Sequence, residues 1–165
     1  MRVYIPATFA MLAQLQETGV LHARGGWAFA ATPELTEFYT SGDIEEIEAI
    51  AFDDAAMASI RLLAIGDEER FPHRRVVVSA DVEGAAGEPE MGESVVRLAG
   101  PISRGDVAAV HVDVAEAEEA TRRAIAHIDA ADLGDEDAEL AVGDAQDNYM
   151  AFYHPSELPF LIELL

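Results

Sequence analysis

Hydrophobic and polar residues alternate in several short stretches of the chain, which predicts β-strands. At the N-terminus, Val3 and Ile5 alternate with Arg2 and Tyr4. This period of two is typical of a strand with one buried face. The same reasoning predicts further strands at residues 27–31, 74–82, 94–100, 108–112 and 149–153.

A spacing of three and four between apolar residues predicts helices elsewhere. The longest helix is expected over residues 43–65, where Ile44, Ile47 and Ala51 begin a continuous apolar stripe. Ile50, Met57 and Ile60 form a second apolar flank of this helix, which either another helix or a partner, such as a second copy, must cover. Four more helices are expected, over residues 8–18, 33–41, 113–129 and from 156 to the C-terminus.

The order of these elements predicts one α+β domain over residues 1–165, without a repeat or a linker. We expect a two-layer sandwich with a mixed or antiparallel sheet, helices on one face, and a ferredoxin-like arrangement in part. Residues 130–148 are rich in acids and hold two glycines. They are therefore expected to be irregular, with a single helical turn near residues 137–142.

Composition excludes several kinds of protein. The chain has no cysteine, and all ten of its basic residues are arginine, so thiolate chemistry, disulfides and lysine-dependent catalysis are excluded. No apolar run approaches the ~18 residues of a membrane span, and no basic segment precedes an apolar one at the N-terminus. We therefore expect a cytoplasmic protein.

The net charge of −22 is the most unusual property of the sequence. Residues 113–147 hold twelve acids and two arginines, and residues 41–69 hold nine acids and one arginine. Such a charge disfavours nucleic acids and anionic membranes and favours a basic partner. An acidic surface selected by a GC-rich genome or a salty cytoplasm is the alternative explanation.

Two groups of residues are candidates for a divalent metal site. The first is Asp135, Asp137 and Glu139, because clustered carboxylates are what Ca²⁺ or Mg²⁺ requires. Leu140 and Gln146 stand where an EF-hand needs glycine and glutamate, so the segment is no EF-hand, and a solvated acidic loop is the alternative.

The second group is Asp81, His111 and Asp113. His111 and Asp113 share one face of a predicted strand, and a histidine with two carboxylates can hold a divalent metal. The alternative is that Asp113 caps the following helix together with Glu116, and that His111 is a hydrogen-bonded core residue.

Motifs for common enzyme classes are missing. The sequence contains no G-x-S-x-G, no G-x-G-x-x-G and no H-E-x-x-H. Four segments, MRVYIPAT at residues 1–8, RRVVV at 74–78, AAVHVD at 108–113 and AADLGDEDAE at 130–139, are similar to a family of short acidic actinobacterial proteins described only as a domain of unknown function. The resemblance covers essentially the whole chain and implies a bacterial cytosolic protein, but it assigns no catalytic residue.

The sequence therefore favours a non-enzymatic cytosolic protein that binds a basic protein surface, without a cofactor. The carboxylates expected to meet this partner are Asp135, Glu136, Asp137, Glu139, Glu45, Glu46 and Asp53. The alternative hypothesis is an enzyme that uses clustered carboxylates with a small ligand or a divalent metal.

Overall fold

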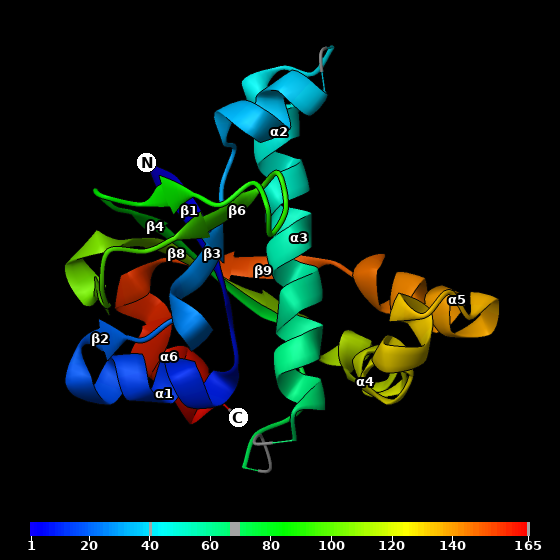
Figure 1. Cartoon of the computed structure of the whole chain (residues 1–165). Helices are drawn as coiled ribbons and strands as arrows, with labels where there is room; N and C mark the ends of the chain where they lie inside the picture. Colours follow the sequence, from blue (N-terminus) through cyan, green and yellow to red (C-terminus); the bar gives the residue numbers. More distant parts are fainter. Residues whose placement is uncertain (40, 67–69, 165) are drawn as a thin grey trace.

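A computed structural model of the chain describes residues 1–39, 41–66 and 70–164, and in this part the chain forms one large antiparallel sheet covered by helices (Figure 1). The sheet has seven strands in the order β5-β6-β3-β1-β4-β8-β9. These strands are β1 (Arg2–Ala7), β3 (Trp27–Phe29), β4 (Val76–Asp81), β5 (Ala86–Gly87), β6 (Val95–Arg97), β8 (Val107–Asp113) and β9 (Met150–Tyr153). A separate pair joins β2 (Val20–Leu21) to β7 (Ile102–Ser103).

The helices in the described residues are α1 (Phe9–Thr18), α2 (Pro33–Phe38), α3 (Ile44–Ala64), α4 (Glu118–Asp132), α5 (Glu136–Gln146) and α6 (Leu158–Glu163). Four of them begin at a capping side chain, whereas α4 and α6 have none. Thr8, Thr32, Asp43 and Asp135 each accept a hydrogen bond from a backbone N–H in the first turn of α1, α2, α3 and α5. Such bonds satisfy N–H groups that have no partner inside a helix. At the other end of α1, Gly19 adopts a left-handed φ of 76°, a conformation that favours glycine.

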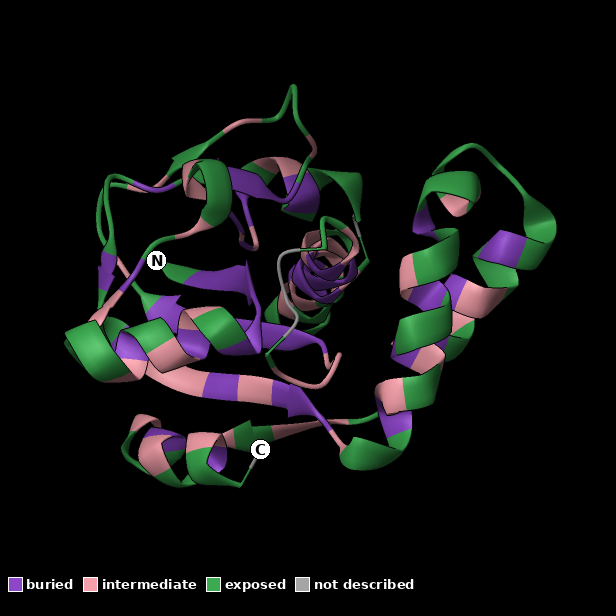
Figure 2. Cartoon of the chain, turned by 90° about the horizontal axis from the view of Figure 1, so that it is seen from below, coloured by how far each residue is buried: buried purple, intermediate pink, exposed green. Residues whose placement is uncertain are grey.

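Neighbouring residues of the central strands point to opposite faces of the sheet. Val3 and Ile5 of β1 belong to a core that includes residues of α1 and α6. Tyr4, between them, belongs to a second core with Ile47, Ala51 and other residues of α3. Alanines along this side of α3 let the helix pack closely on the sheet. In Figure 2 α3 is seen end-on, with its buried residues in purple.

The predicted α+β class with an antiparallel sheet is confirmed. The arrangement is ferredoxin-like in part, because β3 and β4 both pair antiparallel with β1 and are connected through α2 and α3. Two parallel strands with one strand between them form a split β-α-β unit. The helices cover both faces of the sheet, whereas the sequence predicted helices on one face only. Both faces of β1 are apolar enough to be buried, with Val3 and Ile5 on one side and the Tyr4 ring on the other.

The segment expected to be irregular is a helix. α5 spans eleven residues, because Ala138, Val142 and Ala145 form an apolar stripe that α4 and α3 cover. α4 begins at Glu118, five residues later than expected, after a 3₁₀ turn at Ala115–Ala117. The two-residue strands β2, β5 and β7 are too short to show a period in the sequence.

The second apolar flank of α3 is covered within the chain. Ile60 is fully buried against Ala124 and Ile128 of α4 and Val142 and Ala145 of α5. Ile50 and Met57 are partly buried. Ile60 and Met57 of this flank are therefore covered by the chain's own helices α4 and α5, and Ile50 packs against the core between α3 and the sheet, so the flank does not require the second copy of a homodimer to cover it. Among the described residues, no helix combines the length and the apolarity that crossing a membrane requires.

Candidate functional site

A pocket lies between the first turns of α3 and the strands β1, β4 and β8, and we call it the α3 pocket. Its volume is about 350 Å³. The residues that line it are Arg2, Tyr4, Glu45, Glu48, Ala49, Phe52, Ser79, Ala109 and His111. A volume of this size lies at the lower end of the range usual for small-molecule sites.

Strand register brings the polar side chains of the pocket together. Tyr4 pairs with Ser79, and Ser79 pairs with Ala109 on the next strand, so the three form a row across β1, β4 and β8. Arg2 pairs with Asp81 two positions away. Because alternate residues share a face, these positions project to the α3 side of the sheet.

The hydroxyl of Tyr4 donates a hydrogen bond of 2.9 Å to Oε2 of Glu48. Burial, followed by the hydrogen bond to Glu48, raises the pKa of Tyr4 to about 12. The phenol therefore keeps its proton at neutral pH and holds the Glu48 carboxylate at the pocket wall.

Ser79 and His111 form the second polar pair, with 2.7 Å between Oγ and Nε2. Burial, with a smaller contribution from the charge of Arg2, lowers the pKa of His111 to about 4. The ring is therefore neutral at pH 7. Phe52 of α3 lies edge-on to it, with 4.8 Å between the ring centroids.

The Ser79–His111 pair is better suited to binding than to catalysis. A general base works best when its pKa lies near the operating pH, and a pKa of about 4 makes His111 a weak base at pH 7. Ser79 is only 2% exposed, so its hydroxyl is turned into the structure and fixes the histidine ring.

Replacing His111 with glutamine is expected to flatten the fall in stability on acidification. The unfolded chain binds a proton on His111 below about pH 6.5, whereas the folded chain excludes it down to about pH 4. Stability is therefore lost as the pH falls through this window and is unaffected above it. Between pH 7 and pH 4.5, the free energy of unfolding of His111→Gln should therefore rise by about 1–2 kcal/mol relative to that of wild type. This is less than the full pKa difference would give, because the ring is partly solvated.

Urea unfolding of both proteins at the two pH values measures this difference. Comparing the variant with wild type cancels the titration of the many carboxylates that both share. A stability difference that does not change with pH would show that His111 titrates alike in the folded and unfolded chains.

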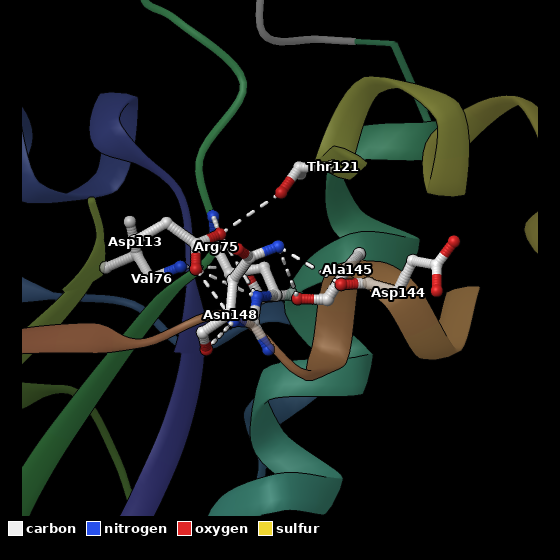
Figure 3. A network of polar contacts seen from close by, with 8 residues as sticks. Arg75, Val76, Asp113, Thr121, Asp144, Ala145 and Asn148 are labelled. Atoms are coloured by element: carbon white, nitrogen blue, oxygen red, sulfur yellow. Dashed lines mark hydrogen bonds and ion pairs between the residues drawn. The ribbon is translucent and has the colours of Figure 1, made fainter. Parts of the chain in front are cut away.

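Asp113 is held in a different network and does not line the α3 pocket (Figure 3). Its carboxylate accepts hydrogen bonds from Nη2 of Arg75 at 2.7 Å and from the Arg75 backbone N–H at 2.8 Å. Nε of Arg75 also donates to both carboxylate oxygens, at 3.0 and 3.1 Å, and the hydroxyl of Thr121 donates at 3.2 Å. Asp113 therefore neither caps α4, as one prediction held, nor has a free oxygen for a metal.

Neither predicted metal trio is assembled. His111 bonds to Ser79, Asp113 to Arg75, and Asp81 forms an ion pair with Arg2 at 2.7 Å. Asp135 caps α5 by accepting the N–H of Ala138, whereas Asp137 and Glu139 are exposed on that helix. In the described ranges, no three His, Asp or Glu side chains are grouped as a metal would require.

The carboxylates predicted to meet a basic partner fall into separate places. Asp135, Glu136, Asp137 and Glu139 lie at the start of α5, in the hairpin that α4 and α5 form beside α3 (Figure 1). Glu45 and Glu46 lie in the first turn of α3 near α2, and Glu45 lines the α3 pocket. Asp53 lies further along α3, beside Asp54, whose carboxylate accepts a hydrogen bond from Ser94.

Sequence reasoning predicted Glu45 and His111 as site residues and missed the others that line the pocket, among them Tyr4, Glu48, Phe52 and Ser79. A signal was present, because polar residues recur at alternate positions in residues 2–4 and 79–81, and His111 is a polar residue inside a further apolar strand. The pattern could not be combined into a site without knowing that these three strands are neighbours.

The chain belongs to a family of unknown function, DUF6912, whose model matches residues 1–162. This confirms the resemblance to an uncharacterised domain. Neither the curated proteins nor the solved structures give a significant match.

Proposed function

We propose that the protein is a non-enzymatic cytoplasmic protein that binds a basic protein surface through the hairpin of α4 and α5, here called the acidic hairpin (residues 118–146). The observation that supports this most directly is the position of Glu136, Asp137 and Glu139. They occupy the first turn of α5 and are all exposed. Figure 2 shows the exposed outer side of this hairpin, which faces away from the sheet.

Arginines neutralise one carboxylate at each end of α4 and leave the first turn of α5 negative. Arg74 binds Glu118 at 3.0 Å and Arg61 binds Asp132 at 2.8 Å. Within the described part of the chain, no ion pair involves Glu136, Asp137 or Glu139. Their charge is therefore available to attract a basic partner over the Debye length of ~8 Å at physiological salt.

Apolar side chains accompany these carboxylates. Leu133, at the turn between α4 and α5, is 89% exposed, and Leu140 of α5 is 68% exposed. Protein interfaces combine apolar contacts with charges that steer association. The two exposed leucines beside the negative first turn of α5 therefore provide the apolar contacts and the charge that a partner with a basic, partly apolar surface requires.

The test is capture of partners from a native cytosolic extract by wild type and by two charge-matched variants. The first variant carries Glu136→Gln, Asp137→Asn and Glu139→Gln, and keeps Asp135 because it caps α5. The control carries Glu17→Gln, Glu37→Gln and Glu90→Gln, three exposed acids outside the hairpin. Basic proteins captured by wild type and by the control should be lost from the hairpin variant.

The association rate of a captured partner should also fall steeply with salt, since the Debye length shortens from ~30 Å at 0.01 M to ~8 Å at 0.15 M. Equal capture by both variants would show that only the overall charge matters. The proposal of a hairpin-specific partner would then be abandoned.

A further inference from the structure

We propose that the α3 pocket is a binding site for a small organic ammonium ion, such as a quaternary or protonated amine with a short aliphatic chain. This site is distinct from the acidic hairpin, and the inference does not depend on the proposed protein partner. It rests on the charge of the pocket, the rings that line it and the bonds that fix them.

The charge of the pocket favours a cation. Glu45 and Glu48 both line it, from the first two turns of α3. The one arginine in its wall, Arg2, forms two hydrogen bonds with Asp81, at 2.7 and 3.0 Å. Because Asp81 offsets Arg2, the carboxylates give the pocket a net negative charge, which repels anionic ligands.

Three rings adjoin one another along the pocket. The Tyr4 and Phe52 centroids are 5.8 Å apart, and the Phe52 and His111 centroids are 4.8 Å apart. Aromatic rings beside carboxylates are the chemistry that recognises ammonium groups, because the ring face attracts a cation that is too weakly hydrated to prefer water. The neutral state of His111 adds a ring without adding a repelling charge.

The pocket is formed before a ligand arrives. Tyr4 is 7% exposed and bonded to Glu48, and Ser79 holds the His111 ring. Side chains already fixed in place lose little conformational entropy on binding. A metal ion is a poor alternative occupant, since Nε2 of His111 is engaged with Ser79 and the carboxylates of the pocket come from α3 alone.

The experiment compares choline with 3,3-dimethylbutan-1-ol, its uncharged isostere, by NMR titration of the ¹⁵N-labelled full chain at constant ionic strength. Choline should shift the amide signals of Tyr4, Phe52 and Ala109 and saturate. The isostere should bind at least about tenfold more weakly, since it has the same shape without the charge.

Two variants and a control assign the effect to the pocket. Glu48→Gln should weaken choline binding about fivefold or more, and Phe52→Leu should do the same while leaving all charges in place. Glu46→Gln removes a carboxylate from the first turn of the same helix, where Glu46 does not line the pocket. This control should bind choline as wild type does. Melting curves of each variant confirm that it is folded.

Four outcomes would overturn the proposal. The first is equal binding of choline and its isostere, and the second is the same loss in Glu46→Gln as in Glu48→Gln. The third is the absence of saturable shifts in the pocket up to about 10 mM choline, beyond which binding is too weak to be specific. Shifts confined to α5 would assign the cation to the acidic surface instead, and would also overturn it.

Discussion

Replacing Arg75 with methionine is expected to lower the free energy of unfolding by about 3–5 kcal/mol, because it leaves a buried carboxylate without its counter-ion. The side chains of Arg75 and Asp113 are 3% and 0% exposed. In the variant, Asp113 keeps only the bonds from the Arg75 backbone N–H and Thr121. The cost arises from the unpaired charge rather than from lost packing, since methionine fills much of the same volume.

A double replacement separates these two causes. In Arg75→Met with Asp113→Leu, no charge remains buried, and apolar residues of similar size often replace a buried ion pair without loss. The double variant should therefore recover most of the lost stability in urea unfolding. If it is as unstable as the single variant, the contact between Arg75 and the backbone oxygen of Asn148, at 3.0 Å, is the more important interaction.

The second large effect is expected for Ile60→Ala, which should lower the free energy of unfolding by about 2–5 kcal/mol. Ile60 is the fully buried residue of α3 on which α4 and α5 pack. The cavity that this substitution creates lies between the acidic hairpin and the rest of the chain. Amide hydrogen exchange should therefore accelerate in α4 and α5 before it does in the sheet.

Ile44→Ala is the matched control, because it makes the same substitution on the same helix where the side chain is 60% exposed. Its effect should stay within about 0.5 kcal/mol. If exchange in Ile60→Ala rises equally in α5 and in the central strands, the hairpin and the sheet unfold as one unit.

The central strands and the helices α1, α2 and α3 were predictable from the sequence because local patterns determine them. The alternation of Val3 and Ile5 with Arg2 and Tyr4 identified β1, and Asp43 marked the start of α3. α5 was missed because its stripe of Ala138, Val142 and Ala145 is small and interrupted by charges. It is stabilised by packing on α4 and α3, which a local pattern does not contain.

The candidate site was harder to predict because it depends on contacts between distant segments. Tyr4 and Glu48 are 44 residues apart, and Ser79 and His111 are 32 apart. The sequence predicted both His111 and Asp113 as metal ligands because they share a face of one strand. In the structure their partners differ, since His111 bonds to Ser79 and Asp113 bonds to Arg75. The acidic residues of α5 are adjacent in the sequence and were recognised, whereas the residues of the less acidic pocket come from separate elements of the chain.

The central place of β1 has a consequence for how the chain is made. β1 precedes its main partner β4 by a long stretch of chain, because their pairing runs from Arg2 opposite Asp81 to Ala7 opposite Val76. Leu158 and Leu161 of α6 complete the core on one of its faces. During translation this apolar strand has no main partner until about half of the chain has been synthesised. Unpaired strands of this kind are prone to aggregate.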